Sequence, residues 1–138
     1  MYQYNAVVTS VHDGDTLSGD IDLGFATWLR NRPMRLRGIS ALELSMVGGP
    51  ETTTEVRAII AAVGPNIVIR SYKVDHDPDD NKSFERYVVV VTLADGRDLG
   101  ATLVANGWAV PWNGRTKPTP YPAWPRQAKL PNGKPPLG

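Results

Sequence analysis

The stretch that organises this chain of 138 residues is 51–63, ETTTEVRAIIAAV, which has the clearest amphipathic pattern. Four apolar residues in it recur at spacings of three and four, as on one face of a helix: Val56, Ile59, Ile60 and Val63. Pro50 suits a first helical turn, and Gly64-Pro65 suits an end. The pattern therefore predicts a helix over 51–63.

Strand-like segments lie on both sides of this helix. Their β-branched residues and alternation predict strands at 2–11, 16–23 and 33–39 before it, and at 66–73 and 84–93 after it. A second, short helix is predicted at 99–106, capped by Asp98 and ended by Gly107. This order predicts a mostly β (α+β) fold, a five-stranded OB-type barrel with two to three helices. A generic α+β sandwich fits the same order nearly as well.

The chain changes character near Pro111, since eight of its twelve prolines lie from there onward. We therefore expect one domain at 1–112 and an irregular, Pro-rich tail at 113–138. Residues 99–138 carry five basic and no acidic side chains, whereas residues 1–98 carry ten basic and fourteen acidic ones. Such a tail indicates either an anionic partner, nucleic acid being the commonest, or only a solvated extension.

Several classes of protein are excluded by inspection. There are no cysteines, no P-loop and no apolar run of about 20 residues, which a membrane span requires. The acidic stretch from Asp75 resembles a calcium loop but has Asp80 in place of the glycine and Arg86 in place of the final glutamate. His12 and His76 are predicted to be surface residues. We expect a monomer that does not engage membranes, cytoplasmic because no signal peptide is present, or secreted if the chain is a mature fragment.

Three separate segments carry reactive groups: DGDT at 13–16, RLRGISALE at 35–43 and FER at 84–86. Hydrolysis of a phosphodiester needs a carboxylate to deprotonate water and fixed cations around the phosphoryl oxygens. Oxygen ligands on a turn also suit calcium or magnesium. Asp15, Glu43, Arg35 and Arg86 are residues of these types. Ordinary surface ion pairs between them are the alternative explanation.

Together with LVANGWA at 103–109, this ordered set resembles the staphylococcal nuclease (thermonuclease) family over about residues 5–112. The resemblance implies an OB-fold barrel that cleaves DNA and RNA with Ca²⁺, or with Mg²⁺ or another divalent ion. It assigns a role by position to eight residues. These are Asp15, Ser40 and Ala41 at the metal, Glu43 as general base, Arg35 and Arg86 on the phosphate, and Phe84 and Trp112 beside the nucleotide.

Three departures from the family pattern bear on these roles. Ser40 stands where a metal-binding aspartate is usual, which predicts weaker metal binding, and Asp13 is a candidate to compensate. Leu42 replaces a proline before Glu43, and Glu85 replaces a glycine before the arginine.

Three functions follow as hypotheses. The first is a metal-dependent nuclease with little sequence preference. The second is a catalytically weak or inactive OB-fold module that binds single-stranded nucleic acid or a protein. The third is an interaction domain whose tail is recognised as a polyproline II segment, for which Pro122 and Pro125 have the spacing.

Overall fold

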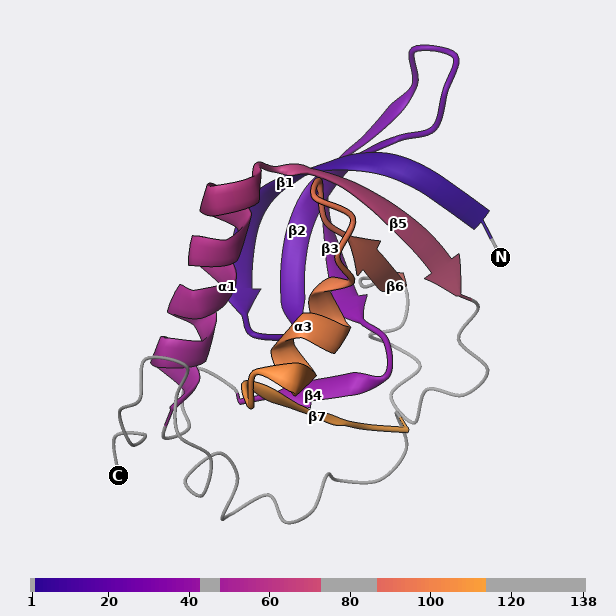
Figure 1. The fold of residues 1–138 in the computed structure, drawn as a ribbon. Helices are drawn as coiled ribbons and strands as arrows, with labels where there is room; N and C mark the ends of the chain where they lie inside the picture. Colours follow the sequence, from indigo (N-terminus) through magenta and orange to yellow (C-terminus); the bar gives the residue numbers. More distant parts are fainter. Residues whose placement is uncertain (1, 43–47, 73–86, 114–138) are drawn as a thin grey trace.

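Five strands close into a barrel in the computed structural model, which describes residues 2–42, 48–72 and 87–113 (Figure 1). Their bounds are Tyr2–Asp13 (β1), Thr16–Asp22 (β2), Trp28–Leu36 (β3), Asn66–Tyr72 (β5) and Tyr87–Thr92 (β6). The order around the barrel is β1-β2-β3-β6-β5, with β5 pairing back to β1. All neighbours are antiparallel except β3 and β6, which run parallel over three residues of each strand. The predicted barrel is confirmed at this level.

Two short strands form a second, smaller sheet at one end of the barrel. β4 (Ile39–Ala41) pairs antiparallel with β7 (Ala109–Pro111), and both lie beneath α3 in Figure 1. Neither strand was predicted, because three residues are too few to show an alternating pattern. This small sheet ties the segment after β3 to the end of the described chain.

The two predicted helices are present as α1 (Gly49–Val63) and α3 (Leu99–Ala105). α1 begins two residues earlier than predicted, with Pro50 in its first turn, and its predicted apolar face is largely buried. The side chain of Asp98 caps α3 by accepting a hydrogen bond from the Ala101 N–H at 2.9 Å. None of the helices in the described ranges is long and apolar enough to cross a membrane.

Alternation along the strands separates the core from the outer surface. The side chains of Met34, Leu36, Ile69 and Val89 are almost fully buried. The residues between them, among them Arg35 on β3, therefore face outward. This alternation sets which side chains of β3 reach the candidate site.

The bounds of one predicted strand are wrong. The strand expected at 33–39 begins at Trp28 and ends at Leu36, so Pro33 lies inside it and Ile39 begins β4 instead. Proline is tolerated there because β6 pairs only with Met34–Leu36, and among the described residues the earlier part of β3 has no partner strand on that side. Strand β6 is described from Tyr87 onward, and residues 84–86 of that prediction lie outside the described residues, as do 114–138 of the predicted tail.

Candidate functional site

The tight turn between β1 and β2 is enclosed by other parts of the fold. A Cβ added to the buried Gly14 would lie 2.6 Å from both the Cβ of Ala41 and the Cγ2 of Thr52. Glycine is therefore required, because β4 and α1 press on the turn from outside. The carbonyl of Asp15 also accepts a hydrogen bond from the Leu36 N–H at 2.8 Å. These contacts hold the turn rigidly against the end of β3.

Asp15 joins this turn to β3 and β4. Its Oδ2 accepts a hydrogen bond from the Ala41 N–H at 2.9 Å and lies 3.5 Å from Nη2 of Arg35. Its Oδ1 accepts a hydrogen bond from the Thr16 hydroxyl at 3.2 Å. The side chains of Asp15 and Arg35 are only 11% and 14% exposed, so water screens this ion pair weakly.

The guanidinium of Arg35 is held in place by its remaining contacts. It donates to the carbonyls of Leu36 at 2.9 Å and Ile39 at 3.2 Å, and it lies 4.8 Å from the centroid of the Trp112 ring. The main-chain N–H of Trp112 in turn donates a hydrogen bond to the Gly38 carbonyl at 2.9 Å. The result is a planar cation fixed between a carboxylate and an indole ring.

Asp13 is the second carboxylate of the turn. Burial, and next the neighbouring Asp15 carboxylate, together raise its pKa to about 6. The Asp13 Oδ1 also accepts a hydrogen bond from the Asp15 N–H at 3.2 Å. A bound cation would favour the ionised form of Asp13, which burial and its neighbour disfavour.

The donor atoms present fit a hard divalent cation in part. Calcium takes six to eight oxygen ligands, and the turn offers the carboxylates of Asp13 and Asp15 beside β4. No cluster of three or more His, Cys, Asp or Glu side chains suited to a metal occurs within residues 2–42, 48–72 and 87–113. Arg35 also already neutralises Asp15, which weakens any cation site here.

Five of the eight residues singled out from the sequence lie at this end of the barrel: Asp15, Arg35, Ser40, Ala41 and Trp112. Ala41 contacts Asp15 through its N–H, whereas the resemblance implied a role for its carbonyl. Ser40 is buried in β4 and pairs with Val110. Glu43, Phe84 and Arg86 lie outside the described residues.

The sequence did not single out Tyr72, the last residue of β5. The Arg37 guanidinium lies 4.1 Å from the centroid of its ring. The signal that was available is the alternation of Arg35 and Arg37 with apolar residues, which predicts that both face the same side of the strand. Nothing in the sequence pairs Tyr72 with them, since the β5–β6–β3 register is a product of the closed barrel.

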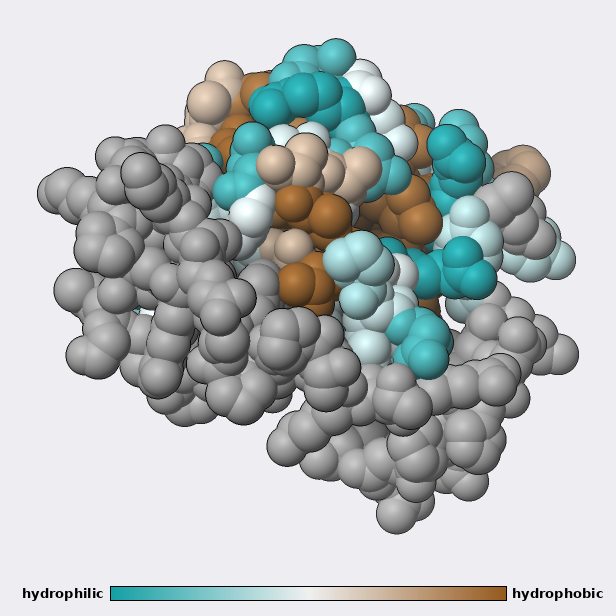
Figure 2. All heavy atoms as spheres, turned by 60° about the horizontal axis from the view of Figure 1, so that its bottom comes forward, coloured by the Kyte–Doolittle hydropathy of each residue, from teal (hydrophilic) through white to brown (hydrophobic). Residues whose placement is uncertain are grey.

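The surface around β4 and β7 is mixed in character. Figure 2 brings this end of the barrel toward the viewer and shows hydrophobic and strongly hydrophilic residues next to each other. At this end of the barrel the Arg35 guanidinium lies next to both the Trp112 ring and the Asp15 carboxylate.

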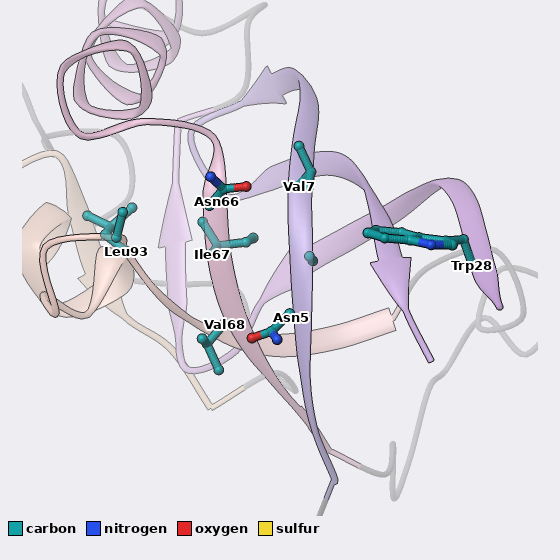
Figure 3. Close-up of a pocket in the computed structure, with 9 residues that line it drawn as sticks. Asn5, Val7, Trp28, Asn66, Ile67, Val68 and Leu93 are labelled. Carbon is teal, nitrogen blue, oxygen red and sulfur yellow. The ribbon is translucent and has the colours of Figure 1, made fainter. Parts of the chain in front are cut away.

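A separate hollow lies on the outside of β1 and β5, where Trp28 flanks it (Figure 3). Its lining is mostly apolar, with Asn5 and Asn66 as the polar residues, and includes no titratable side chain. It shares no residue with the turn at 13–16, and it offers no acid, base or nucleophile.

Protein-family models give no match to this chain, and a search of curated proteins gives none either. The geometry around Asp15 and Arg35 is therefore the basis for a functional assignment.

Proposed function

We propose that this chain is a metal-dependent nuclease with an OB-like barrel, which hydrolyses phosphodiester bonds of DNA or RNA with little sequence preference. The observation that carries the proposal is the guanidinium of Arg35, fixed 3.5 Å from Asp15 and 4.8 Å from the Trp112 ring centroid. A rigid, planar cation beside an aromatic ring matches a phosphate joined to a base.

In this proposal Arg35 binds the phosphate and stabilises the negative charge that develops on it. Two hydrogen bonds to main-chain carbonyls and the ion pair with Asp15 hold the Arg35 guanidinium in place before substrate binds. Little reorganisation of this group is therefore needed during the reaction. Trp112 stacks on a base, which gives binding without reading its identity. The substrate class follows from these two contacts.

The remaining roles come from the resemblance. Glu43 takes the proton of the attacking water, Arg86 adds a second cation, and Phe84 lies beside the nucleotide. Asp15 and the Ala41 carbonyl would hold the calcium ion, with Ser40 as a weak neighbouring ligand. The resemblance assigns no role to Asp13, which would add a second carboxylate beside Asp15 in compensation for Ser40. When bound, the ion supplies further positive charge at the phosphoryl oxygens.

The test of this function is digestion of plasmid DNA and of an RNA oligonucleotide with calcium, and again with a chelator. We expect cleavage by the wild type, loss of cleavage with the chelator, and a loss of about 100-fold or more in Glu43→Gln, the range typical of a missing general base. Glu55→Gln on α1 is the matched control and should cleave like the wild type. Cleavage that survives in Glu43→Gln would contradict the proposed general base.

The metal site has a test that does not depend on activity. Calorimetric titration with calcium should show weak binding by the wild type, tighter binding by Ser40→Asp and weaker binding by Asp13→Asn, because carboxylates are better ligands than neutral groups for a hard cation. Unchanged affinity in Ser40→Asp would contradict the position assigned to Ser40.

A second candidate is a module that binds single-stranded nucleic acid without cleaving it. It is favoured by the way Asp15 is already engaged, with Arg35 and the Ala41 N–H on the same carboxylate oxygen. Binding of oligonucleotides without any cleavage in calcium, magnesium or manganese would support this module over the nuclease.

A further inference from the structure

A second arginine–aromatic pair lies close to the candidate site, on the outer face of β3, β5 and β6. The Arg37 guanidinium lies 4.1 Å from the centroid of the half-buried Tyr72 ring, and Arg37 itself is exposed. The proposed function uses neither residue.

Strand register places this pair beside Arg35. β3 aligns Arg35 with Val88 on β6, and β6 aligns Val88 with Tyr72 on β5. All three face outward, since Leu36 and Val89, next to Arg35 and Val88, line the core, as does Ile69, an odd number of residues before Tyr72. Arg35 and Tyr72 are therefore two strand spacings apart, about 10 Å between backbones.

Arg35 and Arg37 differ in whether a carboxylate neutralises their charge. Arg35 has its ion pair with Asp15, whereas no carboxylate within the described ranges lies at ion-pair distance from Arg37. The main chain of Arg37 is anchored, because its N–H donates to the Val89 carbonyl at 2.8 Å. Arg37 thus presents a cation that is positioned on an aromatic ring and that no carboxylate of the described residues neutralises.

We infer that Arg37 and Tyr72 form a second nucleotide subsite, which binds the unit next to the one held by Arg35 and Trp112. The subsite takes single-stranded nucleic acid, because a base stacks on the half-buried ring of Tyr72 or on the guanidinium plane of Arg37 only when that base is unpaired. Arg37 contributes a phosphate contact. The inference rests on the proposed function only insofar as the Arg35 site binds nucleic acid; it does not require cleavage.

The same strand offers a matched control. Trp28 and Arg30 form another arginine–aromatic pair, with the guanidinium 4.9 Å from the ring centroid. Arg35 lies seven positions after Trp28 on β3, which corresponds to about 23 Å along an extended strand. An effect of aromatic or cationic surface in general would appear in both pairs, whereas a subsite appears only in the pair next to Arg35.

The experiment is fluorescence anisotropy of the full chain with a labelled thymidine mononucleotide and labelled hexathymidylate, in chelator so that nothing is cleaved. Tyr72→Leu should weaken hexamer binding about tenfold and leave mononucleotide binding within twofold, since only the hexamer loses a base stacked on Tyr72. Tyr72→Phe, which keeps the ring, should bind like the wild type, as should Trp28→Leu. Arg37→Gln should reduce the slope of log affinity against log salt by about 0.7, the value for one phosphate contact on a single strand.

The outcomes separate this inference from the proposed function. Hexamer binding that is unchanged in Tyr72→Leu but weakened in Arg35→Gln would overturn the subsite and leave the site at Arg35 standing. Equal losses for mononucleotide and hexamer in Tyr72→Leu, or an equal loss in Trp28→Leu, would also overturn it. A wild type that binds neither ligand would overturn both proposals.

Discussion

The two turns of the β1–β2–β3 meander are equally short, each contains a glycine and a threonine, and they have opposite environments. The turn at 13–16 is covered by α1 and β4, and its Gly14 and Asp15 are buried. The turn at 24–27, between β2 and β3, is exposed at every residue, and Phe25 at its tip is fully exposed. Figure 1 shows that this second turn projects from the opposite end of the barrel. The difference teaches that a turn gains chemical specificity from what packs over it, not from its own composition.

The largest expected effect is a substitution of the buried glycine. Gly14→Ala should lower the free energy of unfolding by about 3 kcal/mol, since the new methyl would meet Ala41 and Thr52 at 2.6 Å. Gly24→Ala in the exposed turn meets nothing within 4 Å and should cost about 1 kcal/mol, from its left-handed backbone alone. Urea unfolding measures both. Equal losses of unfolding free energy for the two substitutions would show that the buried turn rearranges to accept the methyl group. The difference in packing between the two turns would then be unimportant.

The next effect concerns the two ion pairs of the meander. Asp15→Asn should destabilise the fold by about 2 kcal/mol, because it leaves the nearly buried Arg35 without its counter-charge. Asp20→Asn removes the counter-charge of Arg30, whose side chain is 67% exposed, and should cost less than about 1 kcal/mol. Thermal unfolding at low and high salt is the measurement. A salt dependence as strong for Asp15 as for Asp20 would contradict the assigned burial.

The exposed turn should be open to improvement. Its central residues Phe25 and Ala26 have φ of 54° and 58°, and the Thr27 N–H donates to the Gly24 carbonyl at 2.9 Å. Two positive φ values are what a type I′ turn requires, and Asn-Gly is its preferred pair. The double variant Phe25→Asn, Ala26→Gly should therefore be more stable by about 1 kcal/mol. A loss of stability would mean that the Phe25 ring contributes to the fold.

The last effect is the pH dependence of stability that Asp13 introduces. Its pKa is raised to about 6 in the fold, against an ordinary value of 3.8. Between these values the folded state binds more protons than the unfolded one, so this contribution to stability is complete below about pH 4 and is lost as the pH rises through 6. Asp13→Asn removes this pH dependence. In thermal unfolding, the stability of the variant relative to the wild type should therefore rise from pH 4 to pH 7. Parallel pH profiles would contradict the raised pKa.

Much of the barrel was predictable because its elements have periodic patterns. The apolar face of α1, the alternation around Met34 and the Asp98 cap each specify a local structure that the fold retains. What was missed has no periodic signal. The three-residue strands β4 and β7 exist because they pair with each other, and Pro33 sits within β3 because that edge is free there.

The candidate site was predictable in residue type and only in part in arrangement. The joint occurrence of Asp15 and Arg35 at one place follows from the β2–β3 pairing, which aligns Thr16 with Arg35. The contact of Arg37 with Tyr72 depends on a parallel pairing between β3 and β6 that single-sequence patterns do not encode. Long-range register is a property of the whole closed barrel, and local sequence carries little of it.

The parallel ladder between β3 and β6 has a consequence for biosynthesis. It joins Met34–Leu36 to Tyr87–Val89, partners separated by more than a third of the chain. Ordering so long an intervening loop is slow compared with forming a hairpin. On the ribosome, the first three strands have therefore emerged well before their last neighbour has been translated. Throughout that interval the nascent meander exposes the edge of β3 that later pairs with β6. This edge is a surface that chaperones can bind until the barrel closes.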